Sequence, residues 1–419
     1  MGLINKVSKI TKNGDARVLA SNFVWLSALQ VAGYLFPLIT LPYLARVIGA
    51  DGFGKVAFAS AIMVWIQTIA DWGFNLTATR DVAKNRDDAQ KVSEIFSNVL
   101  WARCLLAVVS LAVLIGLILL VPKFYENRLV ILVTYLMIPG HILFPDWFFQ
   151  AVEKMKYITI LNVLLKLLFT IAVFVFVKDR EDYILQPLFT SIGYVFCGVL
   201  SLYLIIGKWG VKLQKPSIAR IITTIKDSTN VFINNLAPNL YNSLSIVLLG
   251  IFGGSGATGI FDGGNKFISL CQQFMTVISR VFFPYLSRQS NRHKILVVIN
   301  MTVAIVFALL LFVLAPYIVR LMLSAEFAES VYVIRILAIS VIFLALSDSY
   351  GTNYLIIHKR DRELRNITII GSIFGLCIGV PLIYYYGYTG AAVTITTARV
   401  VLGVLTYVVA KREKYVETN

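Results

Sequence analysis

The sequence predicts an all-α polytopic membrane protein with about twelve transmembrane helices. Hydrophobic residues make up 58% of its 419 residues, charged residues make up only 14%, and the mean hydropathy is +0.78. A soluble domain carries roughly 25% charged residues, so these values exclude an ordinary soluble protein. A membrane-spanning helix needs about 20 apolar residues, and at roughly 30 to 35 residues for each helix with its loop the chain accommodates about twelve. Little of the chain remains for a soluble domain.

Twelve apolar segments follow one another along the chain, and none has a long charged interruption. They are residues 22–45, 56–79, 97–121, 128–150, 157–177, 184–206, 229–252, 264–286, 295–317, 331–356, 366–386 and 389–410. Prolines are expected to break the first, fourth and seventh segments, at Pro37 and Pro42, at Pro139 and Pro145, and at Pro238. Before the first segment, residues 1–17 combine basic with apolar residues, and we expect them to form a retained, interfacial amphipathic lead-in.

The distribution of Lys and Arg predicts the orientation of the segments. Of the 38 basic residues, 25 fall in the two termini and every second connection, 8 fall in the remaining connections or at the adjoining segment ends, and 5 lie deeper inside the segments. Because cytoplasmic loops retain Lys and Arg, both termini are predicted to be cytoplasmic. The basic residues are scattered rather than clustered, so the net charge of +16 does not indicate a nucleic-acid partner.

A short glycine motif occurs twice in the sequence. Gly49-Ala-Asp-Gly-Phe-Gly54 follows the first segment and Gly254-Ser-Gly-Ala-Thr-Gly259 follows the seventh, so two glycines recur at an offset of 205 residues. This period predicts two parallel halves, which is one of the repeat arrangements of secondary transporters. We therefore expect an N-terminal six-helix bundle that includes the basic lead-in (residues 1–207), a cytoplasmic linker (208–227) and a C-terminal six-helix bundle (228–419).

Polar side chains recur at about four-residue spacing in the first two segments of each half, which places them on one face of each helix. These stripes contain Gln30 in the first segment, Gln67, Asp71, Asn75 and Thr79 in the second, Asn230, Asn234 and Asn242 in the seventh, and Asn265, Ser269, Gln272, Thr276 and Arg280 in the eighth. One interpretation is that they form hydrogen bonds between helices, worth about 0.6 kcal/mol each. We favour a hydrated lumen, because the stripes occupy equivalent positions in the two halves and two of them include a charge.

Charged residues inside the apolar segments favour an anionic substrate. They are Arg103, Lys166, Arg280, Arg335 and Arg399, against Asp71, Asp146 and Asp348. An unpaired cation in a low-dielectric environment is destabilised until an anion neutralises it. Snorkelling toward the interface is the alternative for Arg103, Arg280 and Arg335, and an ion pair between an Asp and Lys166 or Arg399 is also compatible with the sequence.

Stripes and charges together define a set of candidate cavity residues. The set is Gln30, Gln67, Asp71, Asn75, Lys166, Asn234, Asn242, Gln272, Arg280, Asp348 and Arg399.

No residue pattern indicates catalysis or a bound metal. The three histidines, His141, His293 and His358, are far apart, and the four cysteines lie inside apolar segments without metal-ligand spacing. The chain has no GxSxG, P-loop or GxGxxG motif in a strand-turn-helix context. We therefore expect no enzymatic activity and no cofactor.

Three stretches carry a family resemblance. They are Pro42-Tyr-Leu-Ala-Arg46 running into Gly49-Ala-Asp-Gly-Phe-Gly-Lys55, Asp71-Trp-Gly-Phe-Asn-Leu-Thr-Ala-Thr-Arg-Asp81, and Phe144-Pro-Asp-Trp-Phe-Phe-Gln-Ala-Val-Glu-Lys154. They resemble the O-antigen flippases of Gram-negative inner membranes, within the multidrug, oligosaccharidyl-lipid and polysaccharide exporter superfamily. The resemblance covers the whole chain and is strongest in residues 20–160.

The resemblance implies two six-helix bundles around a central cavity, lined mainly by the first, second, seventh and eighth segments, that opens alternately to the two sides. The implied cargo is an oligosaccharide repeat unit on undecaprenyl pyrophosphate, flipped from the cytoplasmic to the periplasmic leaflet for O-antigen or polysaccharide biosynthesis. Transport is implied to be coupled to an ion, for which Asp71, Asp146 and Asp348 are the candidates. The expected partners are the lipid-linked cargo, the bilayer and other membrane proteins of polysaccharide assembly.

Two other functions stay open at this point. The same fold accommodates a small-molecule antiporter of the multidrug type, although exporters of organic cations would need an acidic rather than a basic cavity. A polytopic glycosyltransferase or polysaccharide polymerase would need a sizeable outer loop, and every predicted outer connection has about a dozen residues or fewer.

Overall fold

The computed structural model describes residues 14–288 and 293–417, which are helical apart from short connections. Most of the predicted lead-in, residues 1–17, therefore lies outside the described residues. The described chain packs into two compact units. Unit 1 contains the chain up to Thr40, Ile66–Lys178 and Ile184–Phe232, and unit 2 contains Leu41–Trp65, Asp179–Tyr183 and the chain from Ile233 onward. The predicted division into bundles at residues 208–227 stays a prediction.

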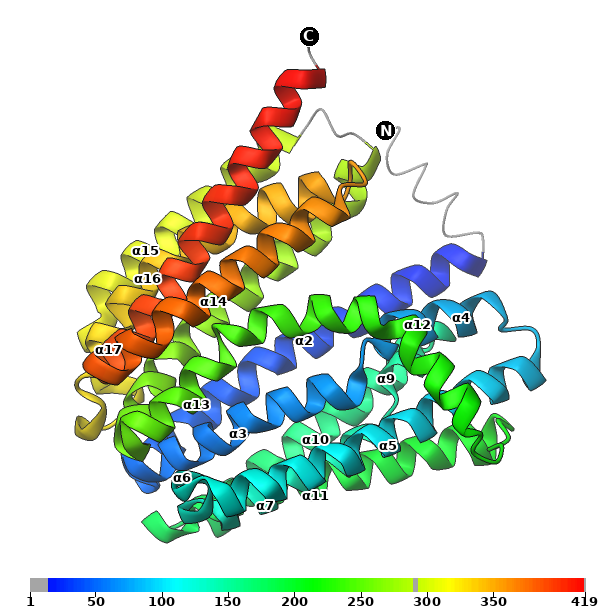
Figure 1. Ribbon diagram of the computed structural model, residues 1–419, viewed down its shortest axis with the longest axis horizontal. Helices are drawn as coiled ribbons and strands as arrows, with labels where there is room; N and C mark the ends of the chain where they lie inside the picture. The colour runs from blue at the N-terminus through cyan, green and yellow to red at the C-terminus, as the bar shows by residue number, and fades with distance from the viewer. Residues whose placement is uncertain (1–13, 289–292, 418–419) are drawn as a thin grey trace. The chain divides into compact units, whose positions relative to one another are not determined.

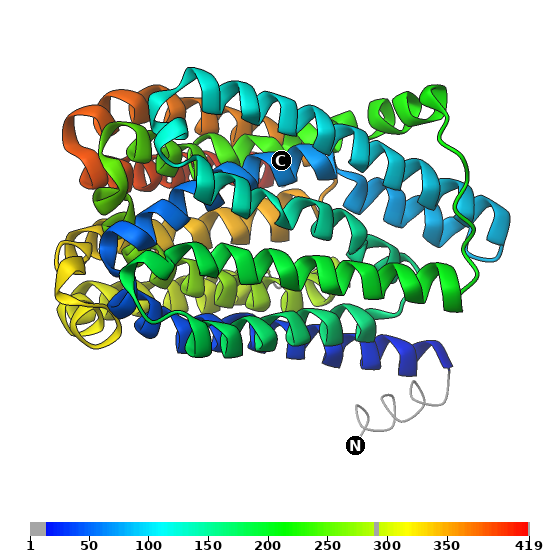
Figure 2. The same cartoon turned by 90° about the horizontal axis from the view of Figure 1, so that it is seen from below.

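Most helices of unit 1 correspond to the first six predicted segments. The helices α2 (Gly14–Val47) and α3 (Gly49–Asp71) each contribute residues to both units. The unit continues with α4 (Phe74–Lys84), α5 (Ala89–Leu120), α6 (Pro122–Glu126), α7 (Arg128–Tyr135), α8 (Met137–Leu143), α9 (Asp146–Ala151), α10 (Met155–Phe176), α11 (Leu185–Leu202), the π-helix η2 (Tyr203–Lys208) and most of α12 (Ile218–Leu236). In both views, α10 and α11 lie side by side (Figures 1 and 2).

Most helices of unit 2 correspond to the last six predicted segments. It contains the short helix η1 (Arg180–Ile184) for most of its length, η3 (Ala237–Leu240), α13 (Ser243–Phe252), α14 (Gly254–Arg288), α15 (His293–Met322), η5 (Ala325–Phe327), α16 (Ser330–Ser347), the π-helix η6 (Asp348–Leu355) and α17 (Asp361–Glu417). The helices α15, α16 and α17 lie side by side (Figure 1). Within α17 the backbone at Gly387 is non-helical, with φ 54° and ψ −129°. This residue separates the predicted segments 366–386 and 389–410.

The starts of two helices of unit 1, α5 and α6, are marked by their residues. The Asp88 carboxylate accepts hydrogen bonds from the main-chain N–H groups of Gln90 at 3.0 Å and Lys91 at 2.9 Å. These bonds satisfy donors that the first turn of α5 leaves free. Pro122 begins α6, a position where proline loses no helical hydrogen bond.

The prolines only partly act as predicted. Pro145 lies between α8 and α9, and Pro238 lies in the short helix η3 between α12 and α13, so both interruptions are confirmed. Pro139 follows a further interruption, because α7 ends at Tyr135 and α8 begins at Met137, and a proline removes the hydrogen bond to the carbonyl group four residues earlier. Pro37 and Pro42, in contrast, lie within the continuous helix α2. The predicted breaks at these two residues are wrong, because membrane helices tolerate proline where neighbouring groups satisfy the freed carbonyls.

The apolar surface supports a membrane environment. In the described part of the chain, nine stretches are helical, long and apolar enough to cross a membrane, and the last of them contains two predicted segments. The seventh and eighth predicted segments are not among the nine, because one is interrupted at η3 and the other is too polar. Large apolar side chains such as Leu120 at 81% and Leu321 at 69% are exposed on both units. Soluble monomers rarely expose apolar surface on this scale.

The repeated glycine motif forms a helix contact inside unit 2. A Cβ atom added to Gly259, on α14, would overlap the main-chain oxygen of Ala50 at the start of α3, and one added to Gly54 would overlap that of Ser255. Small residues allow helix backbones to approach this closely in membranes. The Ser255 hydroxyl also donates a hydrogen bond to the Asp51 carboxylate. The two motifs found in the sequence therefore pack against each other.

Candidate functional site

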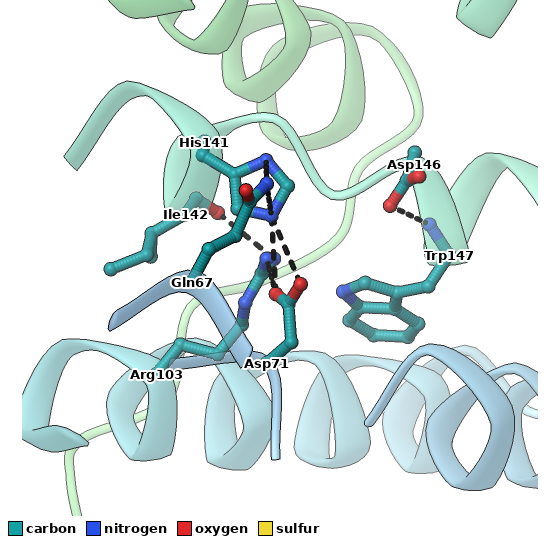
Figure 3. Close-up of polar contacts among 7 residues, drawn as sticks. All are labelled: Gln67, Asp71, Arg103, His141, Ile142, Asp146 and Trp147. Atoms are coloured by element: carbon teal, nitrogen blue, oxygen red, sulfur yellow. Dashed lines mark hydrogen bonds and ion pairs between the residues drawn. The ribbon is translucent and has the colours of Figure 1, made fainter. Parts of the chain in front are cut away.

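An ion pair inside unit 1 joins Asp71, at the end of α3, to Arg103 on α5 (Figure 3). The Arg103 guanidinium donates to Oδ1 of Asp71 and to the main-chain oxygen of Ile142, the latter at 3.4 Å. The Arg103 side chain is only 2% exposed, and the Asp71 side chain is 28% exposed. Arg103 therefore does not snorkel, because its charge is balanced inside the unit.

A histidine completes this cluster from a third element. Nε2 of His141, on α8, lies 3.2 Å from both carboxylate oxygens of Asp71. The amide nitrogen of Gln67 lies 3.1 and 3.2 Å from the two ring nitrogens of His141 (Figure 3). Asp71 thus lies between the guanidinium of Arg103 and the imidazole ring of His141. We call Gln67, Asp71, Arg103 and His141 the Asp71 cluster.

The other predicted residues of unit 1 lie outside the Asp71 cluster. Asp146 accepts a hydrogen bond from the main-chain N–H of Trp147 at 2.8 Å. Lys166, on α10, is half-buried and pairs with no acidic residue in the described part of the chain. Gln30 is half-buried and Asn75 is exposed. Of the candidate cavity residues predicted in this unit, therefore, only Gln67 and Asp71 belong to the Asp71 cluster.

Arg399, on α17, organises a second cluster inside unit 2. Its guanidinium donates to the Ser340 hydroxyl at 2.9 Å, and at longer range to Oε1 of Gln272 at 3.4 Å and Oδ1 of Asn242 at 3.5 Å. Arg399 is 5% exposed, whereas Gln272 is exposed and Asn242 is half-buried. These partners are all neutral, so no described carboxylate balances this charge. We call these four residues the Arg399 cluster.

The remaining predicted residues of unit 2 lie apart from the Arg399 cluster or outside the description. Asp348 begins the π-helix η6, and its Oδ1 accepts a hydrogen bond from the Ser279 hydroxyl at 3.2 Å. Asn234 is exposed on α12. The side chain of Arg280 lies outside the described residues. The alternative in which an Asp neutralises Arg399 is not seen among the described contacts.

Sequence reasoning missed Arg103, His141 and Ser340 as members of these clusters. Helical spacing shows which side chains share a face of one helix, but it does not show which side chains meet across two helices. The available signal for Arg103 was its placement, with Asp71, toward the predicted cytoplasmic ends of consecutive segments. His141 carried no comparable signal, because it lacks polar neighbours at helical spacing.

Comparison with known proteins decides the family. Residues 19–290, more than half of the chain, match the family described as polysaccharide biosynthesis protein. The chain belongs to this family. A protein of Escherichia coli strain K12 that is named as an O-antigen transporter is 28% identical over 391 residues, which cover 91% of this chain and 94% of that protein. A Shigella dysenteriae protein of the same name is also 28% identical over 391 residues, covering 92% and 98%.

Solved structures of the predicted superfamily share the fold. The lipid II flippase MurJ, in an inward closed conformation, has a TM-score of 0.74 over 94% of this chain and 87% of that chain, at 13% identity. An inward-facing multidrug resistance transporter of the MATE family has a TM-score of 0.67 over 94% and 98%, at 12% identity. At these identities the likeness concerns the fold alone. The prediction of an all-α polytopic membrane fold is confirmed.

Proposed function

We propose that this protein is a bacterial inner-membrane flippase for oligosaccharide repeat units linked to undecaprenyl pyrophosphate. It would move these units from the cytoplasmic to the periplasmic leaflet by alternating access. The observation that carries the proposal is similarity along most of the chain to proteins named as O-antigen transporters, with 28% identity over 91% of this chain. The likeness of fold to a lipid II flippase agrees with this proposal.

The Arg399 cluster supports a cargo that carries negative charge. A guanidinium cannot lose its proton in a protein, and burying it without a counter-ion is costly. Its described partners are a hydroxyl and two amides, so an approaching phosphate oxygen would supply the missing charge. The exposed Gln272 amide offers donor and acceptor groups of the kind that bind sugar hydroxyls. We therefore propose that the Arg399 cluster contacts the pyrophosphate or the adjoining sugar.

Lys166 supplies a second cation, from unit 1. Its ammonium group is half-buried and lacks an acidic partner among the described residues, so it too can pair with a phosphate. The roles of Gln30, Asn75, Asn234 and Arg280 in a cavity stay predictions. Ion coupling through Asp71, Asp146 or Asp348 likewise stays a prediction.

Deletion of the gene tests the cargo. We expect lipid-linked repeat units to accumulate on the cytoplasmic leaflet and surface polysaccharide to be lost, because synthesis continues while translocation stops. The measurement is the fraction of lipid-linked sugar accessible to a probe added outside spheroplasts, compared with the fraction in disrupted membranes. Reintroduction of the wild-type gene should restore the outer fraction. An unchanged outer fraction in the deletion strain would refute the proposal, and drug export in a sensitised strain would then favour a multidrug-type antiporter.

Rescue with variants tests the cationic contacts. The double variant Lys166→Gln/Arg399→Gln should lower the outer fraction by about tenfold or more, since loss of a buried charged partner costs at least 2 kcal/mol in comparable contacts. The matched control is Arg335→Gln, because Arg335 also lies inside a predicted segment but contacts the Phe312 ring and main-chain oxygen. This control should rescue translocation. Membrane levels of each variant are measured by immunoblot, and full rescue by the double variant would contradict the cationic mechanism.

A further inference from the structure

The connection between the π-helix η2 and α12 lies along the first turns of α5, inside unit 1. The main-chain N–H of Lys212 donates to the Ser93 hydroxyl at 3.1 Å, and that of Gln214 donates to the Ser97 hydroxyl at 2.8 Å. The Trp101 indole N–H donates to the main-chain oxygen of Gln214 at 2.9 Å. These bonds hold the connection, which is the green loop that leads into α12 in Figure 2, at one place on α5.

The contact with Trp101 indicates the depth of this connection in the membrane. Lys91 and Glu94 lie in the first turns of α5, whereas residues 99–120 are mainly apolar. Trp101 lies at the start of this apolar part, and tryptophan side chains are enriched at the boundary between membrane and water. Because the Trp101 side chain contacts Gln214, we expect the connection to lie at the level of the lipid headgroups.

Three lysines of the connection pair with no carboxylate in the described part of the chain. Lys208, Lys212 and Lys215 are all exposed. Arg220, at the start of α12, differs from them, because it pairs with Glu94 at 3.2 Å. Three residues of extended chain span at most about 11 Å, so Lys212 and Lys215 act on the same small area. The connection therefore presents a local positive surface.

Large apolar side chains are exposed between and beyond these lysines. Leu213 is 46% exposed, and Ile218 and Ile222, four residues apart on one face of α12, are 76% and 44% exposed. These three residues belong to no candidate membrane span. Exposure of such side chains to water is unfavourable. Segments that lie in the membrane interface combine the same two features, since their apolar side chains enter the acyl boundary while their lysines reach the headgroups.

We propose that residues 208–222 form an interfacial surface that binds the headgroups of anionic phospholipids. The lysines complement the phosphate charge, and the exposed leucine and isoleucines contact the adjoining acyl chains. Retention of basic residues in cytoplasmic loops accounts for the lysines, but it requires neither the exposed apolar side chains nor the fixed position against α5. An acidic protein would likewise complement the lysines and leave the apolar side chains unexplained.

Quenching of a fluorophore by brominated phospholipids tests the proposal. Bimane is attached at Leu213→Cys in a full-length protein that lacks the four native cysteines. This protein is reconstituted in phosphatidylcholine vesicles that contain either brominated phosphatidylglycerol or brominated phosphatidylcholine. The two quenching curves give the association constant of phosphatidylglycerol relative to phosphatidylcholine near the fluorophore. We expect this ratio to be about five or more, because one lysine near an anionic surface contributes about a factor of five.

Removal of the lysines should abolish this preference. The triple variant Lys208→Gln/Lys212→Gln/Lys215→Gln should lower the ratio to within about twofold of one, because the charges that attract the anionic headgroup are gone. Higher ionic strength should also lower the ratio of the protein that keeps its lysines, since salt screens exposed charges. A ratio near one in the presence of the lysines would overturn the proposal, as would an unchanged ratio in the triple variant.

Two controls show whether the preference is local. The variant Arg80→Gln/Arg86→Gln/Lys123→Gln removes the same number of charges from unit 1, but each of these residues pairs with a carboxylate, at 2.8, 3.4 and 2.6 Å. This variant should keep the ratio measured with all basic residues present. With bimane at Val109→Cys, an exposed position in the apolar part of α5, the ratio should be close to one. Equal ratios at the two bimane positions would overturn the proposal. Size-exclusion chromatography ensures that folded protein is compared.

The interfacial surface goes beyond the proposed function and does not rest on it. Lipid preference is measured in vesicles that contain no lipid-linked sugar, whereas translocation is measured in cells. A protein that prefers phosphatidylglycerol at this surface, but whose deletion leaves lipid-linked units unaffected, would retain the surface and lose the proposed cargo. The reverse result would retain the cargo and overturn the surface.

Discussion

Arg103 carries a permanent charge in a position that is only 2% exposed, so the stability of unit 1 depends on how that charge is balanced. Asp71 supplies the counter-charge, and the main-chain oxygen of Ile142 accepts a further hydrogen bond. His141 contacts the same carboxylate. Because burying two charges costs several kcal/mol per ion, such a pair adds little net stability over apolar residues, but breaking it by removing one partner is strongly unfavourable.

We therefore expect Arg103→Met to lower the free energy of unfolding by about 3–5 kcal/mol, measured by chemical denaturation in detergent micelles. The double variant Asp71→Asn/Arg103→Met should recover part of this loss, because neither charge remains. The control is Arg80→Gln, which removes an ion pair with Asp81 whose side chains are 59% and 44% exposed, and should cost less than about 1 kcal/mol. Equal losses for Arg103→Met and Arg80→Gln would argue against a structural ion pair.

At the scale of elements, the contact between the starts of α3 and α14 depends on glycine in two ways. Gly49 and Gly254, which stand at equivalent positions of the repeated motif, have positive φ values of 66° and 80°, a conformation that other residues rarely adopt. Gly54 and Gly259, five residues later in each motif, allow the two backbones to touch. Each copy of the motif therefore starts a helix with one glycine and packs that helix with another.

We expect Gly259→Ala to lower the free energy of unfolding by about 1–3 kcal/mol, because the added methyl group would overlap the main-chain oxygen of Ala50 and force the helices apart. Gly256→Ala, on the same helix, is the matched control, since a Cβ there meets no atom within 4 Å. That variant should change stability by no more than about 0.5 kcal/mol. Thermal unfolding of both variants in the same detergent provides the comparison, and equal stability would show that the glycine contact is not required.

At the scale of the whole molecule, the sequence predicts the properties of single segments better than it predicts the contacts between segments. Hydropathy is a property of each segment, so most of the helices follow from it. The seventh and eighth segments are harder to recognise, because η3 interrupts one and polar residues lower the hydropathy of the other. A proline predicts a break where the chain leaves the helix, as at Pro145, but not within α2, where the helix continues.

The candidate sites show the same difference between single residues, which the sequence identifies, and contacts between segments, which it does not. Asp71 and Arg103 were each recognisable as charges inside apolar segments, yet their pairing joins residues 32 positions apart. Arg399 and Ser340 are 59 positions apart, and no periodicity in one helix relates them. The sequence therefore predicts which residues are polar in the membrane, and the structure is needed to group them.

The orientation of the whole chain in the membrane is the prediction that the charge pattern makes most directly. Because 25 of the 38 basic residues fall in alternate connections and the termini, those parts are expected to lie in the cytoplasm. Asp87 and Glu126 lie in two successive connections and are both exposed. In a background without the four native cysteines, Glu126→Cys should react with a membrane-impermeant maleimide added outside intact spheroplasts, and Asp87→Cys should react only in inverted vesicles. The opposite labelling pattern would reverse the topology, and labelling of both variants from one side would show that the intervening helix α5 does not cross the membrane.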